Sequence, residues 1–187
     1  MEKEWGEIIE ILRRERLLDA CKLNRGATAR QLKTLEAHIQ QTLPSALKSF
    51  LSVHNGQADD AKIGVYEGWE ILSTRGIKWH WDDWSEIYEE GVMNEDSAEF
   101  MSAKPPGTIK PMYCNRGWIP FIHDGGGNYI GLDFDPDKRG TAGQIILFGR
   151  DEDEKQLQAN SFQEFLPLLI TRIREADWSD FDDRRSK

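Results

Sequence analysis

The first third of the chain carries its hydrophobic residues at helical spacing. Apolar side chains recur every three or four positions over residues 4–19, which predicts an amphipathic helix. Thr28 and Gln31 form a capping-box pattern, so a second helix is expected over residues 29–41. Pro44 suits the first turn of a third, short helix, because its missing N–H would have no partner there. The third helix is expected to bury Leu47, Phe50 and Leu51.

Beyond residue 64 the hydrophobic pattern becomes shorter and less regular. Apolar pieces predict strands at residues 65–66 and 69–72. Residues 77–91 contain Trp81, Trp84, Ile87 and Tyr88 at helical spacing, which predicts a helix with an acidic outer face. Residues 92–107 lack periodicity and end in Pro-Pro-Gly, so we expect a mobile loop there rather than a domain boundary.

The next part of the chain has the alternation of a sheet. Strands are expected at residues 109–113 and 118–123. The sequence Asp-Gly-Gly-Gly-Asn at 124–128 supplies a turn into the next strand, because glycine adopts positive φ without steric cost. One face of that strand is expected to carry Ile130, Leu132 and Phe134.

The C-terminal part completes the predicted fold. Residues 145–148 are apolar on both faces, which indicates a central strand. Ser161 and Glu164 form a capping box at the start of a final helix, and the charged tail from Trp178 is expected to fray. The order of elements predicts an α+β fold in a single domain over residues 1–187. Its mixed, mostly antiparallel sheet would be flanked by N-terminal helices and a C-terminal helix.

Negative charge is concentrated in one segment. The chain has 187 residues and a net charge of −9, and residues 59–99 hold 12 acidic against 3 basic residues. An acidic surface repels the phosphates of nucleic acid and attracts a basic protein within about a Debye length, ~8–10 Å. The segment therefore argues against nucleic-acid binding and favours a basic protein partner. The alternative is that these acids only keep the protein soluble.

The cysteines and the N-terminus indicate a cytoplasmic protein. Cys21 and Cys114 lie far apart and form no CxxC pair, so two reduced thiols are expected. The first ten residues alternate acids with apolar residues and lack the layout of a signal peptide. No run of about 18 apolar residues is present, so we expect no membrane contact.

The acidic residues at 133–137 resemble the start of a calcium loop but fail where its geometry is strict. Asp133, Asp135 and Asp137 alternate as such ligands do. The sixth position, which needs glycine, is Lys138, and the twelfth, which needs glutamate, is Gln144. An Asp-Pro turn leading out of a strand is the preferred interpretation, and no metal site is predicted.

No catalytic or cofactor motif stands out. The four histidines occupy scattered positions with no spacing that would enforce convergence on a metal. The glycines at 125–127 lack the Lys-Ser/Thr of a phosphate loop, and a strand follows them rather than a helix. Serine occurs in no GxSxG elbow. We therefore expect a protein that is not an enzyme and needs no cofactor.

An ordered pattern runs through the chain. It begins with the segment from residue 26 to 57 and continues with a set of short motifs. The motifs are Gly-Trp-Glu-Ile-Leu-Ser at 68–73, Asn-x-Gly-Trp-Ile-Pro at 115–120, Asp-Gly-Gly-Gly-Asn at 124–128, Leu-Asp-x-Asp-Pro at 132–136, Gly-x-x-Gly-Gln-Ile at 140–145 and Asn-Ser-Phe-Gln-Glu-Phe-Leu at 160–166. In this order they resemble the SUKH superfamily, in particular the Smi/Knr-type cell-wall assembly regulator family. The resemblance covers about residues 5–173 and leaves a charged tail at 174–187.

The resemblance implies an α+β fold and a binding function. Bacterial members of the superfamily act as immunity proteins that neutralise toxins, often nucleases, whereas fungal members are linked to cell-wall synthesis and signalling. The leading hypothesis is a bacterial, cytoplasmic immunity protein that occludes a basic toxin domain. The first alternative is a regulator or scaffold linked to cell-wall metabolism, without a toxin partner. A third is a small-ligand or enzymatic role at a pocket beside Trp118 and Asp124.

Two groups of residues are the candidate partner-binding positions. The first comprises the acids of the predicted helix at 77–91, namely Asp82, Asp83, Glu86, Glu89 and Glu90. The second lies on the strands where the family motifs are densest and comprises Trp118, Asp124, Asn128 and Asp133.

Overall fold

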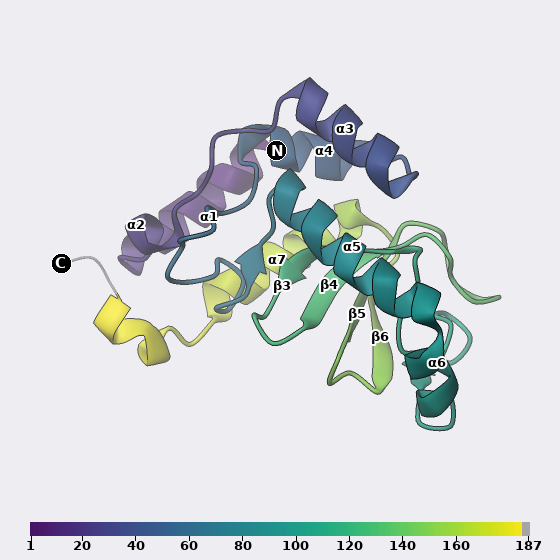
Figure 1. The fold of residues 1–187 in the computed structure, drawn as a ribbon. Coiled ribbons are helices and arrows are strands. Elements are labelled where there is room, and N and C mark those ends of the chain that lie inside the picture. The colour runs from purple at the N-terminus through teal and green to yellow at the C-terminus, as the bar shows by residue number, and fades with distance from the viewer. Residues whose placement is uncertain (185–187) are drawn as a thin grey trace.

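The computed structural model describes residues 1–184, with side chains as far as Phe181 (Figure 1). Helices come first, a sheet follows, and helices end the chain, as the sequence predicts. The helices of this range are α1 (Glu2–Arg14), α2 (Leu18–Cys21), α3 (Ala29–Ile39), α4 (Ser45–Val53), α5 (Thr74–Glu90), α6 (Val92–Ser97), α7 (Phe162–Glu175) and the 3₁₀ helix η1 (Ser179–Arg184). The strands are β1 (Glu70–Ile71), β2 (Ser102–Lys104), β3 (Trp118–His123), β4 (Asn128–Asp133), β5 (Gln144–Gly149) and β6 (Glu154–Ala159).

The sheet is mixed and mostly antiparallel, which confirms the predicted fold class. Its strand order is β1-β3-β4-β5-β6-β2, and only the last pair, β6 and β2, runs parallel. The turn at residues 124–128 joins β3 to β4, as predicted. Gly125 and Gly127 there have φ of +85° and +101°, conformations that side-chain-bearing residues rarely adopt.

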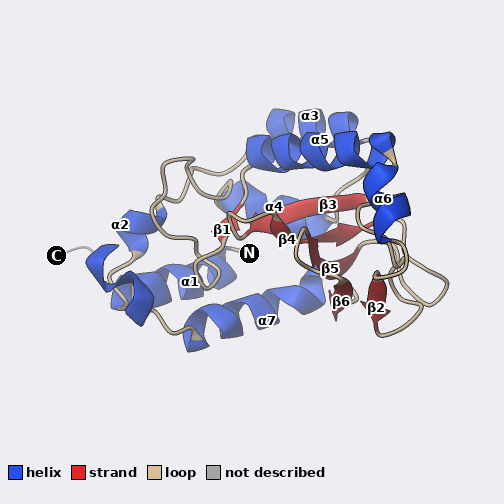
Figure 2. Cartoon of the chain, turned by 60° about the horizontal axis from the view of Figure 1, so that its bottom comes forward, coloured by secondary structure: helices blue, strands red, loops and turns tan. Residues whose placement is uncertain are grey.

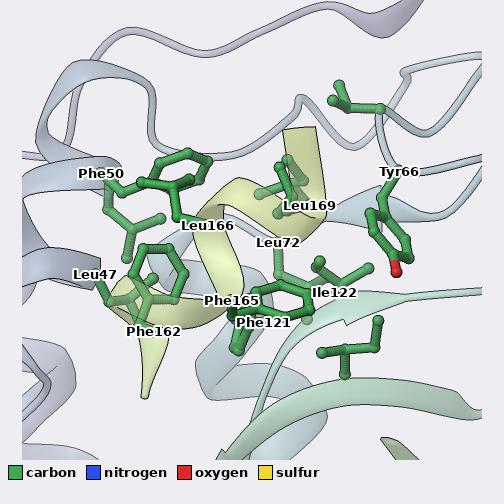
Figure 3. Close-up of a cluster of buried hydrophobic side chains, with 14 of the residues drawn as sticks. Leu47, Phe50, Tyr66, Leu72, Phe121, Ile122, Phe162, Phe165, Leu166 and Leu169 are labelled. Carbon is green, nitrogen blue, oxygen red and sulfur yellow. The ribbon is translucent and has the colours of Figure 1, made fainter. Parts of the chain in front are cut away.

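Helices cover both faces of the sheet, with α3 and α5 stacked on one side and α7 and α1 on the other (Figure 2). The central strand β4 is therefore buried on both faces. Leu132 lies in the core on the α7 side, and Tyr129 lies in a smaller cluster with Trp84 of α5. Phe121 of β3 packs against Phe162 of α7, with ring centroids 5.6 Å apart (Figure 3).

The N-terminal helices follow the prediction with one correction. A single helix over residues 4–19 is wrong, because α1 ends at Arg14 and Arg16 adopts a left-handed conformation with φ of +60° before α2 begins. The predicted capping box of α3 is present, since the Gln31 amide N–H donates to Thr28 Oγ1 (3.2 Å) and the Thr28 N–H donates to Gln31 Oε1 (2.9 Å). Pro44 takes the N-cap position of α4 rather than its first turn.

Three expectations for residues 65–113 are wrong. The stretch 92–107 is not a structureless loop, since it contains α6 and β2. Residues 109–113 form no strand, and Pro111, which has no N–H to donate to a ladder, interrupts them. The strand expected at 65–66 is reduced to isolated bridges, one of them between Tyr66 and Trp69.

The C-terminal region holds more structure than expected. Ser161 caps α7 by accepting from the Glu164 N–H (3.2 Å), while the Glu164 carboxylate accepts from the Asn160 N–H (3.2 Å) instead of closing the predicted box. Trp178 is buried, with Phe181 beside it at 5.9 Å between ring centroids. The expectation that the chain frays from Trp178 is therefore wrong as far as residue 184, and residues 185–187 lie outside the described part.

Candidate interaction surface

Helix α5 separates an apolar inner face from an acidic outer face. Ser73 caps it by accepting from the Gly76 N–H (3.1 Å), and Gly91 ends it with φ of +75°. The inner face packs on the sheet through Ile77, His80, Trp81 and Trp84. The outer face carries the five predicted acids, all of them exposed, which are Asp82, Asp83, Glu86, Glu89 and Glu90.

The charges of α5 oppose its dipole. The helix has no acid in its first turn and no base in its last, whereas Arg75 and Lys78 lie near its N-terminus. Each charge at the unfavourable end of a helix typically costs about 0.3–1 kcal/mol. Partial burial, together with Glu86 and Asp82 nearby, also holds the pKa of Asp83 above its ordinary value. The acids therefore lower the stability of the helix that carries them.

Only two of the five acids are held by other parts of the chain. Asp82 pairs with His38 of α3, and Glu89 pairs with Arg116 at 2.8 Å. Asp83, Glu86 and Glu90 have no hydrogen-bond or ion-pair partner among residues 1–181, whose side chains the structure describes, and their spacing of three and four places them along one stripe. These three carboxylates are available to a partner.

Exposed apolar side chains follow this stripe along the chain. Helix α6 continues from the C-terminal end of α5 (Figure 1). Val92 and Met93 of α6 are 56% and 40% exposed, and Phe100 just beyond it is 69% exposed. Such a grouping of apolar side chains with acids around them is typical of a protein-binding patch. We call it the α5–α6 surface, defined by Asp83, Glu86, Glu90, Val92, Met93 and Phe100.

The sequence prediction missed the apolar half of this surface. Val92, Met93 and Phe100 lie in the stretch 92–107, for which the sequence predicts a loop. Helix α6, which forms part of that stretch, buries none of its residues. A helix without a buried stripe leaves no apolar periodicity to detect. The only available signal was the presence of large apolar residues among acids.

The structure does not bring the four strand residues together. Trp118 and Asp133 pair across β3 and β4 at one end, whereas Asp124 and Asn128 lie at the hairpin end, about 16 Å away by strand geometry. Trp118 is 1% exposed and Asp133 is fully buried. Neither reaches the surface, so both fall outside the surface that we propose for a partner.

The acids Asp133 and Asp124 form hydrogen bonds with neighbouring parts of the fold. Asp133 accepts from Gln144 Nε2 (2.8 Å), and burial raises the pKa of its carboxyl to about 6. Asp124 accepts from the N–H groups of Gly126 (2.6 Å) and Asn128 (2.9 Å), and thereby holds the hairpin turn. These contacts account for Asp124 and Asp133, one acid from each of the Asp-Gly-Gly-Gly-Asn and Leu-Asp-x-Asp-Pro motifs, as parts of the fold.

Two of the scattered histidines meet in space. The rings of His80 on α5 and His123 on β3 lie 4.2 Å apart, and His80 Nδ1 is 3.0 Å from the hydroxyl of Tyr129. Burial, and then the neighbouring His123, lowers the pKa of His80 to about 4. These tilted and edge-on ring contacts seat α5 on the sheet. Within the described residues, no three His, Cys, Asp or Glu side chains form a ligand set for a metal ion, and no helix has the length and apolarity needed to cross a bilayer.

Comparison with known proteins identifies the family. The profile of the SMI1 / KNR4 family (SUKH-1) matches residues 26–167, a range that contains the whole sheet and the α5–α6 surface. The chain belongs to the SMI1/KNR4 family. This confirms the resemblance found in the sequence.

The relatives of this SMI1/KNR4 chain include fungal regulators. It is 32% identical over 174 residues to the cell wall biosynthesis/cell cycle regulator smi1 of Schizosaccharomyces pombe, covering 89% of this chain and 34% of that protein. It is 28% identical to the glucan synthesis regulatory protein of Neurospora crassa (84% and 35% covered) and 25% identical to the cell wall assembly regulator SMI1 of Saccharomyces cerevisiae (83% and 37% covered). The chain spans about a third of the length of each of these relatives, which are named as regulators rather than enzymes.

Proposed function

We propose that this SMI1/KNR4 domain is a non-enzymatic regulator of cell-wall biosynthesis that acts by binding a protein partner at the α5–α6 surface. The printed names of the fungal relatives support the regulatory role, which the sequence offered as its first alternative. Those names concern cell-wall and glucan synthesis and mention no toxin. Regulation of cell-wall biosynthesis is therefore a better supported hypothesis than neutralisation of a toxin.

One observation carries the choice of surface. Three carboxylates without a partner in residues 1–181 stand at the C-terminal half of α5, where they weaken the helix, and the exposed side chains of α6 follow within a few positions of Glu90, with Phe100 just beyond α6. A feature that lowers stability without serving the fold is typical of a functional site. In a complex, the aromatic side chain would supply apolar anchorage, while the acids would attract a basic partner and raise its association rate.

The area that a stable complex must bury determines which surface features the partner needs. A stable complex buries about 1,200–2,000 Å² in total, more than the stripe on α5 alone supplies. The partner therefore needs a basic surface with an apolar pocket or groove that receives Phe100. The positive charge of a basic toxin domain would also complement this acidic surface. The identity of the partner therefore decides between regulation of cell-wall biosynthesis and immunity to a toxin.

Charge reversal of the unpaired acids tests the proposal. We expect the triple variant Asp83→Lys, Glu86→Lys, Glu90→Lys to lose capture of the partner from the native cell lysate by at least tenfold. Its melting temperature should not fall, because the change removes like-charge repulsion and favours the helix dipole. The measurement is quantitative affinity capture with mass spectrometry, at low and high salt, since steering by charge weakens with salt.

A matched control distinguishes loss of the binding site from a general effect of the changed net charge. The variant Glu2→Lys, Glu10→Lys, Glu175→Lys changes the charge by the same amount at exposed acids of α1 and α7, away from the α5–α6 surface. It should capture the partner as the parent does. A cell-wall biosynthesis protein as the specific partner supports the proposed regulation, whereas a nuclease or another toxin replaces it with immunity. Equal capture by all three proteins would exclude the α5–α6 surface.

A further inference from the structure

A separate cavity lies at the opposite, N-terminal end of α5. It opens to solvent, has a volume of about 940 Å³, and is walled by the loops at 24–28 and 55–60 and by the first residues of α3 and α5. A groove of about 290 Å³ continues from it between the two helices and shares Gln31, Thr74 and Arg75 with it. The combined volume is larger than a single small anion needs.

Both helices point their N-termini at this cavity. Gln31 of α3 and Thr74 of α5 line the same cavity, and two turns further along His38 pairs with Asp82. The helices therefore run in the same direction, and Figure 2 shows them stacked on one side of the sheet. Their aligned dipoles make the cavity electrically positive and favour an anion there.

Cationic side chains surround the cavity in a chain whose net charge is −9. Arg25 lines the cavity, and Arg30 and Lys78 line the groove. Unlike Arg75, which pairs with Asp59, these three side chains have no ion-pair or hydrogen-bond partner within residues 1–181, the part of the chain with described side chains. The other carboxylate at the cavity, that of Asp60, is paired with Lys22. A positive excess thus remains after the internal pairs are formed.

Backbone donors are also open at this place. At the start of α5 the Thr74 N–H donates to Asn55 Oδ1 (2.9 Å) and the Gly76 N–H donates to Ser73 Oγ (3.1 Å). The N–H groups of Arg75 and of Arg30 in α3 donate to no acceptor in the described part of the chain. They are thus free to bind ligand oxygens beside the guanidinium groups.

From the cavity, its unpaired cations and its open donors we propose that the cleft between the N-termini of α3 and α5 binds a phosphate group carried by a larger molecule. A phosphate monoester suits it better than a carboxylate, because it carries nearly two negative charges and three acceptor oxygens. Arg25 and Arg30 offer planar forks that match phosphate oxygens, and Lys78 adds a point charge. The remaining volume accommodates the group that carries the phosphate. This site is independent of the proposed partner surface.

Titration with defined phosphates tests the site. The probes are inorganic phosphate, a phosphoserine peptide and a nucleoside diphosphate, each added at constant ionic strength with chloride as the balancing anion. Calorimetry and amide NMR should show saturable binding, with the shifts centred on the N–H groups of Arg30 and Arg75. Tighter binding of the peptide assigns a phosphorylated protein segment as the source, and tighter binding of the diphosphate assigns a small metabolite.

Two double variants with the same change of charge decide the outcome. Arg25→Gln with Arg30→Gln should weaken every phosphate probe by tenfold or more, with the amide spectrum otherwise preserved. Arg13→Gln with Lys33→Gln, at exposed positions outside the cleft, should leave the affinity within twofold. Shifts that are scattered over the surface and do not saturate, or equal affinity in both double variants, would overturn the proposal.

Discussion

Gln57→Leu is expected to lower the free energy of unfolding by about 4 kcal/mol or more, the largest single-residue effect that we anticipate. Gln57 is fully buried, and its amide joins four backbone groups from separate segments. Its Nε2 donates to the carbonyl groups of Cys21 (2.7 Å) and Ile63 (2.8 Å), and its Oε1 accepts from the N–H groups of Val65 (2.9 Å) and Ile71 (3.1 Å). Leucine would leave all four without a partner, at about 1–3 kcal/mol each.

Chemical denaturation of the variant measures this effect. A domain of this size has about 5–15 kcal/mol of stability in total, so Gln57→Leu is expected to remove a large share of it. Gln163→Leu, at an exposed position of α7, is the matched control and should change the stability by less than about 0.5 kcal/mol. A loss below about 2 kcal/mol for Gln57→Leu would mean that the amide does not hold the segment from residue 57 to β1 as described.

The second large effect is a gain, since Lys155→Met should raise the stability at pH 7 by about 1–3 kcal/mol. Lys155 of β6 is fully buried, and its ammonium group donates to the Glu152 carbonyl oxygen. Met101 Sδ lies 3.5 Å from the ammonium nitrogen and the centroid of the Tyr113 ring lies 5.8 Å from it, while the carboxylates of Asp153 and Glu152 offset the burial only in part. Burial lowers the pKa of this group to about 8. The folded state therefore disfavours the charge that the unfolded chain accepts freely.

The pH dependence identifies the cause of this gain. Because the pKa of Lys155 is about 8 in the folded state and about 10.5 in the unfolded state, the charge costs stability below pH 8 and ceases to do so above pH 10.5. The difference between parent and Lys155→Met should thus be full at pH 7 and small near pH 10. Lys104→Met, at an exposed position of β2, should show no such dependence. A Lys155→Met protein that is less stable than the parent at pH 7 would show that the ammonium group stabilises the strand.

The sequence predicts those elements whose apolar residues lie on one face or form an unbroken run. Helices α3, α4 and α7 and strands β3, β4 and β5 are of this kind. Strand β6 escapes prediction because Lys155 occupies a buried position and breaks the apolar alternation. Strand β2 is three residues long and pairs with residues of β6 that lie 52 positions further along the chain, so its formation depends on contacts that no local pattern contains.

The candidate surface is predictable only in part, for the same reason. The acids of α5 stand out by their charge, and the helical period places Asp83, Glu86 and Glu90 on its outer face. The burial of Trp118 and Asp133 depends on the layer that packs over the α5 side of the sheet, which strand periodicity does not reveal. Likewise, the meeting of the α3 and α5 N-termini is a tertiary feature without a sequence signal.

The central claim is that the α5–α6 surface contacts the partner. Hydrogen–deuterium exchange of the free chain and of its complex with the captured partner tests this claim most directly, because it locates the covered backbone without any substitution. If the α5–α6 surface contacts the partner, residues 86–100 will exchange more slowly in the complex, and exchange in the hairpin at 123–128 will not change. Unchanged exchange over 86–100, with protection confined to the hairpin or to α7, would contradict it.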